Sequence, residues 1–213
     1  MKIRPEELTD NGYDLLDNLG HKELIPFVRT YLKKRTPISL FYTFSNVVIS
    51  GIIVFWFWKN YQIVNFSLGS GFTYFSYGLA IAFGLIPIHE YIHVLAYKSQ
   101  GADKTSYDAN LKKFYFMAIA DKFVANKKEF QIVALAPFVV ISATLLILFL
   151  FSSQLWSFTI LGVLLTHTAF SSGDFGMLSY FDYHKNKDIV TYDDKENSIS
   201  YFYGKNKQRK TIK

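Results

Sequence analysis

Four long apolar segments run through this chain of 213 residues and constrain its fold more than any other feature. They lie near residues 38–58, 72–97, 130–151 and 155–172. Each comes close to the roughly 20 residues that a helix needs to cross the hydrocarbon core of a bilayer. Soluble domains rarely contain several apolar runs of this length. The sequence therefore predicts an all-α integral membrane protein, a four-transmembrane-helix bundle with small cytoplasmic β-hairpin elements.

Basic residues alternate along the chain with these segments. Lysine and arginine precede the first segment, as Lys33, Lys34 and Arg35, and recur between the second and third segments and in the C-terminal tail. Lys59 is the only basic residue in the loop after the first segment, and the turn at 152–154 contains no basic residue. By the positive-inside rule, this pattern predicts a multi-pass protein of the cell membrane with both termini cytoplasmic.

The formal net charge of +6 indicates a lipid partner rather than nucleic acid. The basic positions are scattered among acidic ones instead of forming one basic face, so we expect contact with the bilayer and no nucleic-acid binding. The chain has no cysteine, which excludes disulfides and thiolate metal sites and is compatible with a bacterial membrane protein. The sequence carries no prediction of the oligomeric state.

The chain divides into three predicted parts. Residues 1–36 form a cytoplasmic N-terminal region, where leucines such as Leu15, Leu19 and Leu24 recur at roughly helical spacing and predict amphipathic helices. Residues 37–178 form the four-span membrane core. Residues 179–213 form a cytoplasmic tail, in which β-prone runs at 188–192 and 198–203 predict a hairpin.

The second apolar segment contains the motif His89-Glu90-Tyr91-Ile92-His93. Two histidines four residues apart share one face of a helix, so both imidazoles can bind one zinc ion, and Glu90 can act as general base. Ionisable side chains are costly inside a bilayer, which by itself indicates a functional site. The alternative is a pair of structural histidines with Glu90 in an ion pair, but the spans contain no lysine or arginine to pair with it.

Catalytic zinc usually has three protein ligands and one open position. No further histidine follows within a few residues of His93, so the third ligand comes from elsewhere; the candidates are His21, His167, Asp174, Asp182 and His184. The second and fourth spans run in the same direction, so Asp174 arrives on the same side of the membrane as the two histidines. His167 lies seven residues earlier, about 10 Å deeper, and is the alternative ligand or a group that orients one. Asp174 could also be a solvated residue at a helix end.

With these motifs the chain resembles the intramembrane zinc metalloproteases of the site-2 protease type, and most closely the small DUF3267 zincin-type branch. The resemblance rests on His89-Glu90-x-x-His93, Ala134-Leu135-Ala136-Pro137, His167 and Gly173-Asp174. It implies one zinc ion held by His89, His93 and Asp174, with Glu90 as the catalytic base. Site-2 proteases carry Asn-Pro-Asp-Gly around the third ligand, whereas this chain has Ser-Gly-Asp-Phe at 172–175.

The expected function is that of a zinc-dependent endopeptidase that cleaves a membrane-associated protein or peptide near the cytoplasmic face. Its substrate-binding residues are not evident from the sequence. The alternative is a non-proteolytic membrane protein of protease ancestry that binds metal or serves as a scaffold. A transporter would need ionisable residues in the outer halves of the spans, and these are nearly absent.

Overall fold

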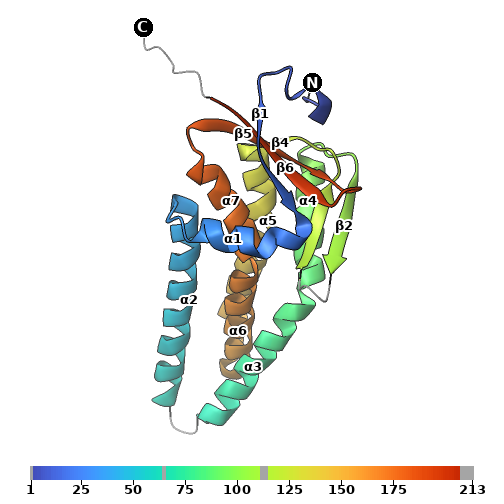
Figure 1. The fold of residues 1–213 in the computed structure, drawn as a ribbon. Coiled ribbons are helices and arrows are strands. Elements are labelled where there is room, and N and C mark those ends of the chain that lie inside the picture. Colours follow the sequence, from blue (N-terminus) through green and yellow to red (C-terminus); the bar gives the residue numbers. More distant parts are fainter. Residues whose placement is uncertain (1, 64–65, 111–114, 207–213) are drawn as a thin grey trace.

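The computed structural model describes residues 2–63, 66–110 and 115–206. Long helices form one end of the molecule, and strands and short helices form the other, where the described part of the chain begins and ends (Figure 1). The helices are α1 (Leu24–Leu32), α2 (Pro37–Tyr61), α3 (Leu68–Gly84), α4 (Ile86–Ser99), α5 (Lys127–Phe151), α6 (Gln154–Phe170) and α7 (Ser172–Tyr183), with 3-10 turns at Pro5–Glu7 and His21–Glu23. The strands are β1 (Asp14–Gly20), β2 (Thr105–Asn110), β3 (Tyr115–Ala120), β4 (Ala125–Asn126), β5 (Lys187–Asp194) and β6 (Ile199–Asn206).

Two helices, α2 and α5, are each long and apolar enough to cross a membrane. The other two predicted spans are broken. The pair α3 and α4 bends by 45° at Leu85, and the pair α6 and α7 bends by 42° at Ser171, so the number of candidate spans is two, or four if each bent pair is one span. Pro87 lies in the first turn of α4, where its missing N–H costs little, and it favours a new helix start there.

The predicted all-α four-transmembrane-helix bundle is wrong as a fold class. The described residues form seven helices and two antiparallel sheets, one with strand order β1-β6-β5-β4 and one made of β2 and β3. The tail hairpin was predicted and is present as β5 and β6. In the loop after α4, the apolar run at 114–120 forms β3 from Tyr115 onward, and Phe114 lies outside the described residues.

The first strand explains the error in the N-terminal region. The leucines of Asp14–Gly20 were predicted to be helical, but this segment is extended and pairs with β6, from Asp14 opposite Gly204 to Gly20 opposite Ile199. Helical spacing correctly describes only α1 in this region. Strand formation depends on a partner almost 190 residues away, which local periodicity does not reveal.

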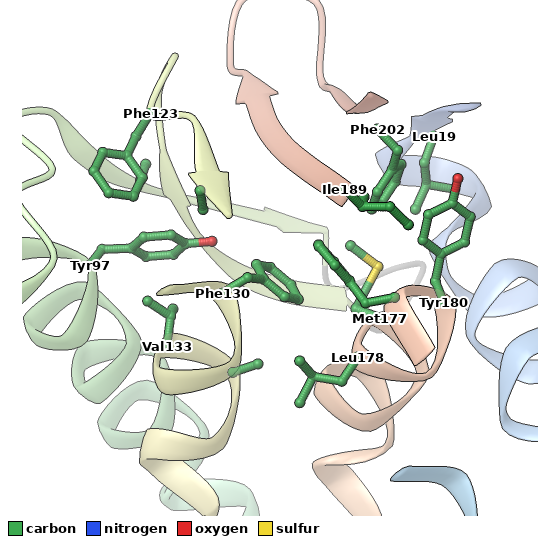
Figure 2. Packing of buried hydrophobic residues seen from close by; sticks show 14 of the residues in the cluster. Leu19, Tyr97, Phe123, Phe130, Val133, Met177, Leu178, Tyr180, Ile189 and Phe202 are labelled. Atoms are coloured by element: carbon green, nitrogen blue, oxygen red, sulfur yellow. The ribbon is translucent and has the colours of Figure 1, made fainter. Parts of the chain in front are cut away.

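A hydrophobic core joins the sheet to the ends of α4, α5 and α7. Figure 2 shows Phe130, Met177, Tyr180 and Phe202 packed together in it, and Tyr180 and Phe202 are completely buried. Burial of large aromatic side chains stabilises such a junction by roughly 1.5–3 kcal/mol each. This core fixes α7, and therefore Asp174 at its start, against α4 and α5.

Candidate metal centre

Helix α4 carries the two histidines of the motif on its inward face. His89 and His93 are 8% and 6% exposed, and their Nε2 atoms lie 3.1 Å apart. One helical turn separates the two residues, so the imidazoles converge from adjacent turns as the four-residue spacing predicts. The ligand atoms of His89, Glu90 and His93 all lie within 4.8 Å of one another, so this group could hold a metal ion.

Helix α7 brings Asp174 to the same point. Its Oδ2 lies 3.2 Å from His89 Nε2 and its Oδ1 lies 3.1 Å from His93 Nε2. Zinc bonds to nitrogen and oxygen are about 2.0–2.2 Å long, so two ligand atoms of a tetrahedral site are roughly 3.3–3.6 Å apart. The observed separations are close to that spacing. Two imidazoles and one carboxylate are also a donor set that catalytic zinc uses, so these residues fit a zinc ion.

The far ring nitrogen of each histidine has its own partner. His93 Nδ1 donates to the carbonyl oxygen of Val133 at 2.9 Å, and His89 Nδ1 lies 3.2 Å from His167 Nε2. Metal-binding histidines are usually oriented in this way, with one nitrogen hydrogen-bonded and the other facing the ion. His167 therefore lies beside Nδ1 of His89, whereas Asp174 lies beside Nε2, and in this position His167 can orient the ring of His89.

Glu90 is held by the hairpin that follows α4. The backbone N–H of Ala118, in β3, donates to Glu90 Oε2 at 2.7 Å. The carboxylate is buried, with 6% of the residue exposed, and no lysine or arginine is paired with it among the described residues. A backbone amide fixes the position of one carboxylate oxygen and leaves the other free to exchange a proton.

The remaining candidate ligands lie elsewhere in the fold. Asp182 accepts a hydrogen bond from Lys127 Nζ at 2.6 Å, His184 Nδ1 donates to the Tyr180 carbonyl at 3.1 Å, and His21 pairs with Asp108. Among the five candidates for the third ligand, the structure thus brings Asp174 to the two histidines and places His167 next to His89.

Two cavities meet at the motif. One of about 130 Å³ is lined by His89, Glu90, His93 and Asp174, together with Ala118 and Asp193. The other, of about 690 Å³, lies beside the two helix breaks and is mostly apolar, with His89, Glu90 and His167 in its wall. Asp193 lines the smaller cavity; burial raises the pKa of its carboxyl, and a 2.5 Å hydrogen bond from Ser200 opposes that rise. Both cavities therefore reach His89 and Glu90.

One polar contact of the N-terminal region could not be predicted from the sequence. His21, 2% exposed and just before α1, places Nδ1 2.8 Å from Oδ2 of Asp108 in β2. Since β2 pairs with β3, this contact ties the N-terminal region to the hairpin that carries Ala118. A histidine in a polar segment carries no signal for such a distant partner.

We expect His21→Ala to lower the free energy of unfolding by about 1–3 kcal/mol, because it removes a buried, charge-assisted hydrogen bond. Thermal or denaturant unfolding of the purified protein measures the change. Lys22→Ala is the matched control, since Lys22 is an exposed neighbour. Equal stability of the two variants would show that the His21 contact adds nothing to the fold.

Comparison with known proteins identifies a family. No curated protein and no solved structure matches the chain significantly. The model of the family DUF3267, described as "Putative zincin peptidase", matches residues 82–188, which is half of the chain and includes the whole candidate metal centre. Zincins are zinc peptidases, so the match implies zinc and indicates a metallopeptidase, while the relation to site-2 proteases stays a prediction. The chain belongs to the DUF3267 family.

Proposed function

We propose that this protein is a zinc-dependent endopeptidase that cleaves a membrane-associated polypeptide near the cytoplasmic face of the membrane. The observation that carries the proposal is the convergence of His89, His93 and Asp174 at 3.1–3.2 Å, with the carboxylate of Glu90 beside them. His89, His93 and Asp174 are the proposed ligands of one ion, and Glu90 is the proposed general base.

In the proposed hydrolysis of a peptide bond, the metal ion and Glu90 have different roles. Zinc, when bound, supplies Lewis acidity, which polarises a carbonyl and activates water near neutral pH. Glu90 accepts a proton from the attacking water through the oxygen that Ala118 does not hold, and returns it to the leaving amine. The water oxygen forms a C–O bond to the scissile carbonyl carbon as the C–N bond breaks, and the proton lost from the water ends on the amine nitrogen, so bonds and protons balance. The buried position of Glu90 limits competing hydrogen bonds from bulk water.

The membrane setting is supported by the surfaces of the apolar helices. In their most apolar windows, α2 and α5 are only 17% and 28% buried within the protein. Phe44, Val54 and Phe151 are among their exposed side chains, at 65%, 69% and 85%. Exposed apolar surface of this extent is typical of a face covered by lipid or another protein. With lysine-rich segments at the strand end, the proposed topology puts the site near the cytoplasmic interface, where water is available.

The edge of β3 is the proposed contact for an extended substrate. In the described part of the chain β3 pairs only with β2, and the N–H of Ala118 on its other edge already faces the site. An extended peptide can add to such an edge by backbone hydrogen bonds. A helical substrate would first unwind locally, because a hydrogen-bonded helix shields its carbonyls.

The Glu90→Gln variant tests the proposal. We expect it to retain zinc, since the three proposed ligands remain, but to lose cleavage by at least about 10²-fold, the usual contribution of a general acid–base group. Zinc content is measured on purified protein, and cleavage by comparing the membrane proteomes of cells that express wild type or variant. Glu129→Gln, in the first turn of α5 and outside the two cavities at the motif, is the control. Identical proteomes with wild type and Glu90→Gln would contradict the peptidase.

The alternative function, metal binding without proteolysis, predicts a different result. A metal-storing or scaffold protein needs the ligands but has no use for Glu90, so its zinc content and partners would be the same in wild type and Glu90→Gln. The backbone hydrogen bond from Ala118 to Glu90 favours the peptidase, because it positions a carboxylate that a simple metal-binding site does not require.

A further inference from the structure

Helix α5 contains a proline in its interior, Pro137, which is fully buried. In a regular helix, the amide of residue 137 would donate to the carbonyl of Val133, four residues earlier. Proline has no N–H, and its ring also crowds that carbonyl. Val133 is therefore a place in α5 where the normal intrahelical donor is missing.

The carbonyl oxygen of Val133 is the acceptor for His93. The distance from His93 Nδ1 is 2.9 Å, and Val133 and His93 are 1% and 6% exposed, so water does not compete freely for this bond. A carbonyl can only accept, so Nδ1 of His93 carries the proton. In the neutral imidazole, Nε2 then carries the lone pair, and this atom faces His89 and Asp174.

We propose that Pro137 is a positioning residue of the metal centre: by leaving the Val133 carbonyl without its helical donor, it provides the acceptor that fixes the tautomer and ring orientation of His93. The inference rests on the proposed metal site, and it assigns a role to a residue that is itself no ligand. It also explains why a helix-breaking residue is present at the level of the site, where it would otherwise only weaken α5.

Pro137→Ala restores the missing N–H and is the test variant. The new amide competes with His93 for the Val133 carbonyl, so we expect zinc affinity to fall by about 10–100-fold, the usual loss when a partner of a metal-binding histidine is removed. Affinity is measured on the purified full-length protein by competition with a colorimetric zinc chelator. Pro37→Ala is the matched control, because Pro37 lies at the start of α2 and lines neither cavity at the motif.

A second pair of variants, made in a protein that lacks His93, separates an effect on the orientation of His93 from general damage to α5. In a protein carrying His93→Ala, the weaker residual affinity is expected to be the same with and without Pro137→Ala. Unchanged affinity of the single Pro137→Ala variant would overturn the inference, and so would a loss that persists when His93 is absent. Wild type that binds no zinc would contradict the proposed function as well, whereas zinc binding without any proteolysis would contradict only the peptidase and leave the role of Pro137 intact.

Discussion

Replacing Asp174 with alanine is expected to lower zinc affinity by about 10²- to 10³-fold. Zinc sites with four protein ligands are stabilised by roughly 10–16 kcal/mol, so one ligand accounts for roughly 2.5–4 kcal/mol. Asp174 has an oxygen within 3.2 Å of each Nε2 atom, and its charge would also balance that of the ion. His167→Ala is expected to cost less, about tenfold, because His167 contacts only the far nitrogen of His89.

Zinc titration of the two variants distinguishes their roles. Asp182→Ala serves as the control, since Asp182 lies on the same helix as Asp174 but pairs with Lys127 outside the site. Thermal unfolding in the presence of a chelator separates the loss of a metal ligand from damage to the fold. Without metal, the Asp174→Ala, His167→Ala and Asp182→Ala proteins are expected to have similar stability. A larger loss for His167→Ala than for Asp174→Ala would assign the third ligand to His167 instead.

Much of the candidate site could be predicted because its chemistry lies in short sequence motifs. His89, Glu90 and His93 follow from a spacing that any helix converts into one face. The position of Asp174 could be predicted from the directions of two apolar segments alone. The second and fourth predicted spans run in the same direction, so their C-terminal ends lie on the same side. The structure brings these residues together as that reasoning predicts, although their roles as ligands and base stay predictions.

The contacts that hold these residues could not be predicted in the same way. Glu90 depends on an amide in β3, and His93 depends on a carbonyl in α5. The amide of Ala118 leaves no trace in residue identity; Pro137 indicates a carbonyl without its helical donor, but which side chain reaches that carbonyl depends on tertiary packing. The place of β1 in the sheet was missed for a related reason, since β1 is stabilised by pairing with β6 from the other end of the chain. Periodicity reports a local preference, and a distant partner can override it.

The breaks in the second and fourth apolar segments matter for function, yet each segment was predicted to be one continuous helix. At Leu85 and Ser171 the chain changes direction by 45° and 42°, and both breaks lie within a few residues of a proposed ligand. The short helices α4 and α7 can therefore point their proposed ligands toward each other although they run at an angle to α3 and α6. Proline and glycine near each break indicate a helix end but not the new direction.

Gly78→Leu is expected to cause the largest loss of stability, about 3 kcal/mol or more in the free energy of unfolding. Gly78 lies in α3 against Gly162 of α6, and a Cβ at Gly78 would overlap the carbonyl oxygen of Thr159 and lie 2.8 Å from the backbone nitrogen of Val163. These neighbours are backbone atoms, which cannot rotate away, so the helices would have to separate. Small residues allow this close approach in lipid, where packing rather than the hydrophobic effect holds helices together.

The same substitution is expected to weaken zinc binding, although Gly78 touches none of the proposed ligands. Helix α3 leads directly into α4 with His89, and α6 leads into α7 with Asp174, so the distance between α3 and α6 helps to set the distance between these ligands. Denaturant unfolding in detergent and zinc competition measure the two effects. Gly51→Leu in α2 is the matched control, because a Cβ there meets nothing within 4 Å. Should Gly78→Leu bind zinc as tightly as Gly51→Leu, the centre would be held by the sheet-side core alone, and the contact between α3 and α6 would serve only the stability of the long helices.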